Sequence, residues 1–201
     1  LLHPGTHCLA GHVNLPLVLP DEHTMSSDDP AEQATLSAAM HYQEHESGYS
    51  KQQSTRPQTL AYALADSPSG QMAWIIEKYA QWTDCVQNTV RHPENAVERD
   101  VLLDIATHYW MTNSAGSSAK LYWESFTQPD YRPIELPMGI SLFPKELFLC
   151  TERLASTRYQ QLVMFNDQHA SGGHFASLEQ PDALVTDIRR WHAQLLSGEW
   201  L

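Results

Sequence analysis

The order of apolar patterns along the chain is the feature that most narrows its fold. Residues with high strand propensity occur at 11–15, 134–143 and 159–167, and the long stretch between the first two is mostly helical in pattern. Another helical pattern, at 181–198, follows the third. Strands joined by helical crossovers form parallel sheets, so this order predicts an α/β fold with about three parallel strands. The first helical stretch is too long for a crossover, and we therefore predict an inserted, mainly helical cap.

Apolar side chains at helical spacing predict the helices of this cap. In one of them, Ile75, Tyr79 and Trp82 recur along a single face. The predicted helices cover 31–48, 67–84, 94–116 and 117–126. Gly48 is expected to be the C-cap of the first of these helices.

Composition excludes several classes of partner. The chain of 201 residues has 12 Lys and Arg against 24 Asp and Glu, a net charge of −12, so we expect neither a nucleic acid nor an anionic membrane surface as partner. No apolar run reaches the roughly 20 residues of a membrane span. Cys8, Cys85 and Cys150 are far apart and odd in number, which is typical of a reducing compartment and favours a cytoplasmic protein.

Two titratable residues fall after predicted strands, where parallel sheets place their chemistry. Glu146 follows the strand that ends at Phe143, and His174 lies in "GGHF" beyond the third strand. An acid that orients a histidine also stabilises the imidazolium when the histidine accepts a proton. Asp167 is the rival acid, because it is closer to His174 in sequence.

Five stretches together resemble a known family. They are "GHVNLPL" (11–17), "GYSKQQSTRPQTLAYALADSPSGQMAWIIEKYAQWTD" (48–84), "YWMTNSAGSSAKLYWE" (109–124), "PMGISLFPKE" (137–146) and "GGHFASLEQP" (172–181). In this order they resemble the C-terminal portion of microsomal-type epoxide hydrolases. The resemblance implies part of an α/β-hydrolase core at 1–19 and 133–201, with a helical cap at 20–132.

The resemblance also implies a mechanism in two steps. An aspartate attacks the epoxide to form an alkyl-enzyme ester, and His174, oriented by Glu146, activates the water that hydrolyses this ester. Tyr49 in "SGY" and Tyr122 in "KLYWE" match the two cap tyrosines that bind the epoxide oxygen. The implied reactants are a small hydrophobic epoxide and water, with no cofactor and no metal.

The nucleophilic aspartate of the family is expected outside this chain. "LLHPGTH" (1–7) resembles the end of the helix that follows the nucleophile, and neither Asp21 nor Asp28 lies in a strand–turn–helix elbow. We therefore expect a fragment, inactive alone, that needs an N-terminal half or another chain to complete its sheet.

Other readings of the chain remain open. One is a remnant of the fold that binds a hydrophobic ligand or partner without catalysis, in which Tyr49 and Tyr122 only pack their rings. Another is a hydrolase for esters or alkyl halides, which the tyrosine pair disfavours. "HYQEH" (41–45) fits a zinc motif but has no third ligand, and "SSAK" (117–120) fits a serine nucleophile motif without its usual companions, so we adopt neither.

Overall fold

The computed structural model describes residues 8–126 and 129–198 of the chain. The expected helix end at 1–7 lies outside these residues. The chain forms two compact units: a sheet unit of 1–42 with 131–201, and a helical unit of 43–130.

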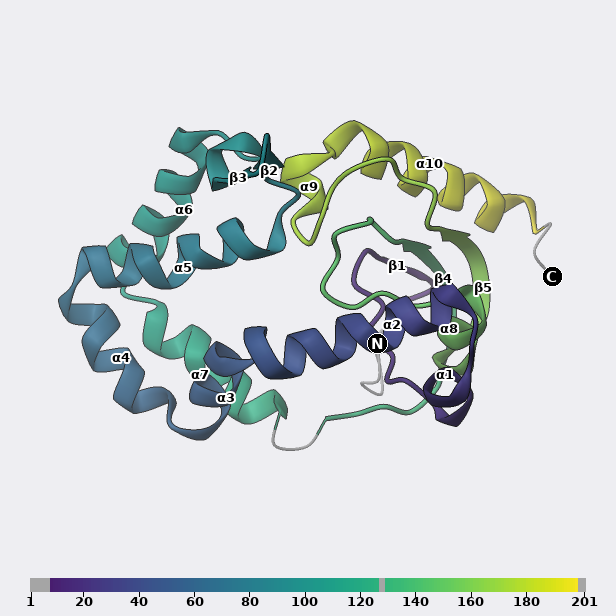
Figure 1. The fold of residues 1–201 in the computed structure, drawn as a ribbon, viewed down its shortest axis with the longest axis horizontal. Helices are drawn as coiled ribbons and strands as arrows, with labels where there is room; N and C mark the ends of the chain where they lie inside the picture. Colours follow the sequence, from purple (N-terminus) through teal and green to yellow (C-terminus); the bar gives the residue numbers. More distant parts are fainter. Residues whose placement is uncertain (1–7, 127–128, 199–201) are drawn as a thin grey trace. The chain divides into compact units, whose positions relative to one another are not determined.

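The sheet unit is built on three parallel strands, as the sequence predicts (Figure 1). β1 (Gly11–Val13) pairs with β4 (Ile134–Ser141), and β4 pairs with β5 (Tyr159–Asn166), so the strand order is β1-β4-β5. Met138 on the central strand lies opposite Gly11 on one side and Leu162 on the other.

Alternate residues of β4 face two different helices. Met138 and Ile140 are fully buried in the core with Leu154 of α8 (Glu152–Arg158). On the opposite face, Ser141 donates a hydrogen bond to Asp187 of α10 (Pro181–Ser197), and Gly139 lies so close to Trp191 of this helix that a Cβ there would meet the indole. Because side chains alternate along a strand, α8 and α10 cover opposite faces of the sheet.

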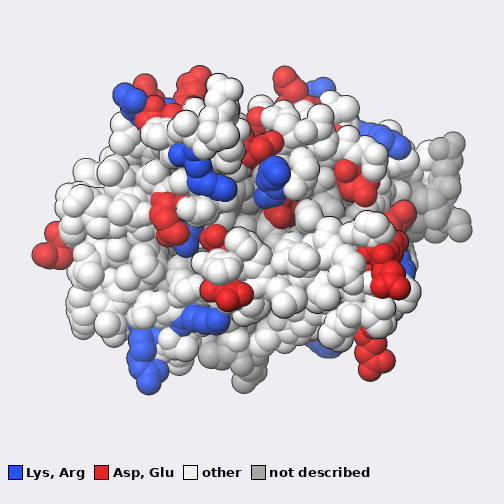
Figure 2. Space-filling model, viewed as in Figure 1, with Lys and Arg blue, Asp and Glu red and all other residues white. Residues whose placement is uncertain are grey.

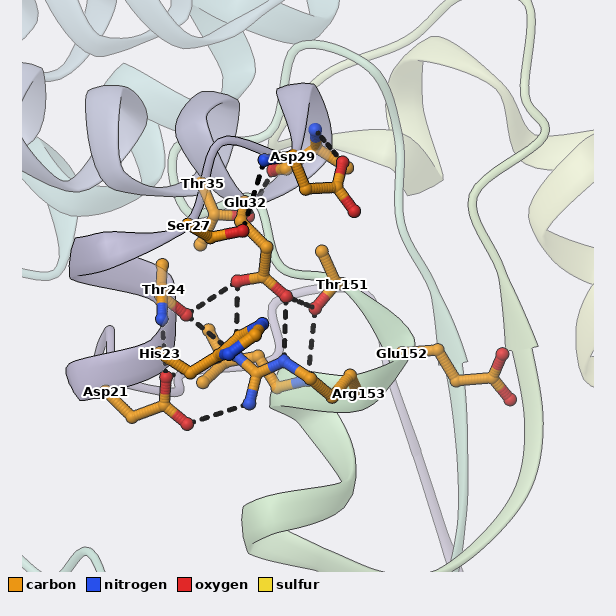
Figure 3. A network of polar contacts seen from close by, with 12 residues as sticks. Asp21, His23, Thr24, Ser27, Asp29, Glu32, Thr35, Thr151, Glu152 and Arg153 are labelled. Atoms are coloured by element: carbon orange, nitrogen blue, oxygen red, sulfur yellow. Dashed lines mark hydrogen bonds and ion pairs between the residues drawn. The ribbon is translucent and has the colours of Figure 1, made fainter.

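A polar network ties α1 (Glu22–Ser26) and α2 (Pro30–His41) to the sheet unit (Figure 3). Arg153 on α8 donates from Nε to Glu32 Oε1 at 2.8 Å and from Nη1 to Asp21 Oδ2 at 2.8 Å. Glu32 also accepts hydrogen bonds from Thr24 and Thr151. These contacts explain why 20–42 group with the sheet unit, whereas the sequence interpretation began the cap at residue 20.

The helical unit consists of helices with one small hairpin, β2 (Val86–Gln87) and β3 (Val90–Arg91). Its helices are α3 (Gly48–Thr55), α4 (Pro57–Asp66), α5 (Pro68–Trp82), a 3-10 turn (Pro93–Asn95), α6 (Arg99–Met111) and α7 (Ala115–Phe126). α3 and α4 pack against α7, and α5 packs against α6. The helices predicted within 67–84, 94–116 and 117–126 are present, whereas α3, α4 and the hairpin were not predicted.

The prediction that Gly48 caps a helix at its C-terminus is wrong. The first long helix leaves α geometry at His41 and continues as a π-helix, Tyr42–Glu46, and Gly48 is the first residue of α3. Glu46, which is nearly buried, accepts a hydrogen bond from Trp82 Nε1 at 2.8 Å. This hydrogen bond links the π-helix to Trp82, and no local sequence pattern predicts it.

Charges on the face shown in Figure 2 are mixed: acidic and basic side chains are interspersed and no basic patch forms there. In the part of the chain that the structure describes, no helix has the length and apolar character needed to cross a membrane.

Candidate active site

Glu146 lies in a tight turn just after β4. Its backbone N–H donates to the Phe143 carbonyl at 3.1 Å, and its own Oε1 accepts from the Leu147 N–H at 2.6 Å. The carboxylate is buried, and Oε2 has no hydrogen-bond partner among the described residues. A buried carboxylate oxygen without a donor is unusual in folded proteins.

The loop that carries His174 is joined to this turn through the backbone. Lys145 N–H donates to the Gly172 carbonyl at 3.0 Å, and Lys145 and Gly173 form an isolated parallel bridge. Gly172 has a φ of +109°, and a Cβ there would approach Phe143 Cδ1 to 2.7 Å. A glycine is therefore required two residues before His174, for both conformation and space.

The two side chains meet in a short hydrogen bond: His174 Nδ1 lies 2.7 Å from Glu146 Oε1. Because an ionised carboxylate only accepts, Nδ1 bears the proton and Nε2 is left as the basic nitrogen. The His174 side chain is 21% exposed, while that of Glu146 is fully buried. The arrangement is that of a histidine oriented by an acid and able to accept a proton from a group in front of it.

The rival acid has other neighbours. Asp167 is exposed, accepts a hydrogen bond from Gln168 and lines a groove with Phe165 and Glu152. Proximity in sequence is thus a poor guide here, because a crossover brings Glu146 to the end of the neighbouring parallel strand.

The two tyrosines lie together in the helical unit. Tyr49 on α3 and Tyr122 on α7 have ring centroids 5.6 Å apart in an edge-to-face arrangement, and both are half-buried. Tyr122 also stacks on Phe126, with centroids 5.2 Å apart. The rings are fixed by packing, and their partial exposure leaves them accessible in a way that a core tyrosine such as Tyr79 is not.

Two charged residues beside the packed rings of Tyr49 and Trp82, Lys78 and Glu46, were not singled out from the sequence. The Lys78 ammonium lies 4.8 Å from the Tyr49 ring centroid and 5.2 Å from that of Trp82, and the Trp82 indole donates to Glu46. A cation over two aromatic faces is attracted by their quadrupoles. The helical spacing of Lys78 and Trp82 on α5 was the available signal, since it places both on one side of the helix.

The zinc interpretation of 41–45 gains no support. His41 ends α2 and His45 lies in the π-helix, and the described residues contain no group of three or more His, Cys, Asp or Glu side chains placed to hold a metal ion. In 117–120, Lys120 forms an ion pair with Glu124 at 3.5 Å, one helical turn later.

No family model matches the chain. Individual relatives do. An epoxide hydrolase homologue of Stigmatella aurantiaca is 44% identical over 197 residues, which cover 97% of this chain and 44% of that protein. Epoxide hydrolase 1 of Sus scrofa is 35% identical over 156 residues, which cover 73% of this chain and 34% of that protein.

Solved structures give the same result. The epoxide hydrolase of Aspergillus niger superposes with a TM-score of 0.78 at 33% identity, over 93% of this chain and 46% of that one. The juvenile hormone epoxide hydrolase of Bombyx mori superposes with a TM-score of 0.79 at 25% identity, over 94% of this chain and 49% of that one.

The chain thus spans about half the length of the solved structures that it matches, and less than half of these two curated relatives. The Stigmatella aurantiaca homologue and the two solved structures match more than nine-tenths of this chain, and the three parallel strands with their helices correspond to part of an α/β-hydrolase fold. The chain is a member of the epoxide hydrolase family, homologous to the microsomal type over part of the full-length protein.

Proposed function

We propose that the protein to which this chain belongs adds water to small hydrophobic epoxides and gives vicinal diols through an alkyl-enzyme ester. The observation that supports this most is the 2.7 Å hydrogen bond between His174 Nδ1 and Glu146 Oε1, in a chain of the epoxide hydrolase family.

In the first step a carboxylate of the whole protein attacks one epoxide carbon, and the bond from that carbon to the ring oxygen breaks. The electron pair of this bond moves to the oxygen, which becomes an alkoxide. We assign Tyr49 and Tyr122 as the phenols that hydrogen-bond this oxygen and protonate it. Preorganised donors of this kind stabilise charge that develops in a transition state. The fixed rings of the pair support the assignment.

In the second step His174 Nε2 removes a proton from water as the water oxygen attacks the ester carbonyl. The tetrahedral intermediate collapses, and the leaving alkoxide takes the proton from the imidazolium and departs as the hydroxyl group of the diol. The carboxylic acid that remains loses its proton, by way of solvent, to the phenolate left by the first step, so the carboxylate and the phenol are both regenerated. Glu146 keeps the imidazole in the tautomer that can accept this proton and stabilises the imidazolium that results. The buried carboxylate and the partly exposed imidazole support this division of roles.

We assign the nucleophile to polypeptide beyond this chain, next to β1. Within the described residues β1 pairs with β4 alone, and this supports a further parallel strand at its other edge in the whole protein.

The test is a chimera in which this chain follows the part of the Stigmatella aurantiaca homologue that it does not match. The chimera is expected to convert styrene oxide to its diol. With His174→Gln, the ester is expected to form and persist, so the intact mass rises by the mass of the epoxide. His192→Gln is the matched control, because His192 is exposed on α10.

Other outcomes contradict the proposal. Turnover by the His174→Gln chimera at the unaltered rate would remove His174 from the mechanism. A chimera that binds the epoxide without forming an ester or a diol would identify a binding remnant of the fold. Hydrolysis of p-nitrophenyl acetate or 1-chlorobutane with no action on the epoxide would place the chain with the other hydrolases of this fold.

A further inference from the structure

A second acid–histidine pair lies in the sheet unit, outside the residues assigned to the reaction. His169 Nε2 lies 2.8 Å from Asp187 Oδ2, and the two side chains are only 10% and 7% exposed. His169 belongs to the same loop as His174, whereas Asp187 lies on α10. The family resemblance assigns no role to either residue.

Asp187 fixes this loop where it leaves the sheet. The carboxylate accepts a hydrogen bond from Ser141 Oγ at 2.6 Å, from the end of β4. Asn166 lies at the end of β5, and its Nδ2 donates to the same carboxylate, 2.9 Å from Oδ1 and 3.0 Å from Oδ2 of Asp187. Because the carboxylate only accepts, His169 Nε2 donates to it. The buried group is thus satisfied by donors from both strand ends and the loop, and its geometry is over-determined.

The His169 ring, held in place by Asp187, packs face to face against the ring of Phe143. The two rings stack in parallel, with centroids 4.0 Å apart and planes 8° apart. The Phe143 side chain is fully buried, so it cannot shift without moving its neighbours.

Phe143 in turn contacts Glu146 and Gly172, the glycine two residues before His174. Its carbonyl accepts the Glu146 N–H at 3.1 Å, so it forms the turn that carries the acid. Its ring lies so close to Gly172 that a Cβ there would come within 2.7 Å of it, so it also confines the backbone two residues before His174. Only two residues, His169 and Phe143, therefore lie between Asp187 and Glu146 in this chain of contacts.

We propose that His169 and Asp187 are positioning residues for Glu146 and His174. The Asp187-bound imidazole holds Phe143, and Phe143 sets the turn and the glycine that bring Nδ1 of His174 to Oε1 of Glu146. The catalytic importance of this positioning rests on the proposed function, but the effect of His169 and Asp187 on the Glu146–His174 hydrogen bond can be tested without any substrate.

The structural test is proton NMR of the chimera in the absence of any epoxide. The hydrogen-bonded Nδ1 proton of His174 is expected far downfield, and its absence in His174→Gln identifies it. His169→Phe keeps an aromatic face on Phe143 and loses the donor to Asp187, while His169→Gln keeps a donor and loses the face. Both variants are expected to broaden or shift this resonance upfield. His192→Phe, on the exposed side of α10, is expected to leave it unchanged.

The outcome that overturns the proposal is a His174 resonance unaltered in position and width in both His169 variants and in Asp187→Asn. Should Asp187→Asn fail to fold, the two His169 variants decide the question. Ser141→Ala is a graded control, because it removes one donor to Asp187 and leaves the His169 contact and the Phe143 stack in place.

The kinetic test uses single turnovers of the chimera. Because His174 acts in ester hydrolysis, His169→Phe is expected to slow that step roughly 10- to 100-fold, the effect of a misplacement of the base by about 1 Å, and to leave ester formation unchanged. An equal decrease in both steps would show a general structural role and overturn the proposal. If the unmutated chimera forms no ester, the proposed function fails, whereas a shifted His174 resonance still supports the positioning role.

Discussion

Arg153 Nε on α8 lies 2.8 Å from Glu32 Oε1 on α2. The Arg153 side chain is 38% exposed, whereas that of Glu32 is only 3% exposed. The same guanidinium binds Asp21, the N-cap of α1. One side chain therefore fastens two helices to the sheet unit, and its charge compensates an acid that would otherwise be buried alone.

Removing this cation is expected to destabilise the sheet unit. Arg153→Gln leaves Glu32 buried without its ion pair, and we expect a loss of about 2 kcal/mol, below the usual value for buried pairs because the guanidinium is partly solvated. Urea unfolding at pH 7 measures the loss. Arg190→Gln, on the exposed face of α10, is the control and should change little.

The same pair predicts a dependence of stability on pH. Hydrogen bonds from Arg153 lower the pKa of Glu32 to about 2 from an ordinary value of 4.5, and Thr24 and Thr151 add to the effect against the cost of burial. Since the pKa is lower in the folded state, the stabilisation is complete above pH 4.5 and is lost as the pH falls toward 2. The difference in stability between the unmutated chain and Arg153→Gln should shrink over this range. A difference independent of pH would contradict the assignment.

Gly172→Ala is expected to damage the loop that carries His174. The substitution places a Cβ against Phe143 at a φ of +109°, which non-glycine residues avoid, and we expect a loss of roughly 1–3 kcal/mol. Thermal unfolding measures this loss, and the His174 proton resonance reports the local change. Gly48→Ala is the control, because a Cβ at the start of α3 meets no atom within 4 Å. Equal stability of the two variants would show that the loop yields without cost.

The three cysteines are expected to react with iodoacetamide at different rates. Burial raises the pKa of Cys150 to about 12, with nearby Asp167 and Glu32 adding to the shift, so its reactive thiolate is scarce at pH 8. Cys85 is fully buried, whereas Cys8 is partly exposed. Timed mass spectrometry of peptides should show Cys8 modified first. Alkylation of Cys150 as fast as that of Cys8 would mean that the core beside α8 opens readily.

In the chimera, Tyr49→Phe and Tyr122→Phe are expected to slow ester formation and to spare ester hydrolysis. Loss of one oxyanion donor typically costs roughly 100-fold or more in rate, and the double variant should lose more than either single variant. Single-turnover mass spectrometry separates the two steps. Tyr62→Phe serves as the control, since this tyrosine is 69% exposed on α4. An effect of the tyrosines on hydrolysis alone would reverse their assigned role.

The 201-residue chain alone is expected to self-associate. The described part of the sheet leaves the second edge of β1 without a neighbouring strand, and such edges pair with other chains. Size-exclusion chromatography should show species larger than the monomer, while the chimera, in which another strand can cover this edge, should elute as a discrete species. A well-behaved monomer of the chain alone would show that the edge is protected locally.

The sheet and several helices could be predicted because their signals are local. Alternation along β4 reports its two faces, and the spacing of Ile75, Tyr79 and Trp82 reports α5. α4 was missed because the stretch was interpreted as polar, although Leu64 is buried and Pro57 begins the helix. The π-helix was missed because no local pattern predicts the hydrogen bond that Trp82, far along the chain, donates to Glu46.

In the candidate site, too, some features follow from local sequence patterns and others depend on contacts between distant residues. The glycine pair before His174 indicated a loop with an unusual backbone, and Gly172 has one. The residues alone left Glu146 and Asp167 as alternatives, and only the family resemblance favoured Glu146. The partnership of His169 with Asp187 had no signal, because neither residue belongs to a motif and a loop and a helix must fold together before the two side chains meet.

Because Gly139 and Trp191 are in close contact, the effect of a mutation at either position depends on which residue occupies the other. A Cβ at residue 139 would come within 2.5 Å of the indole, so the strand and the helix share one volume. If residue 139 is enlarged first, the intermediate protein has an overpacked contact between strand and helix. If Trp191 is first replaced by a smaller residue, the intermediate has a cavity instead. The two changes are therefore strongly non-additive, and the route between sequences at these positions depends on which comes first.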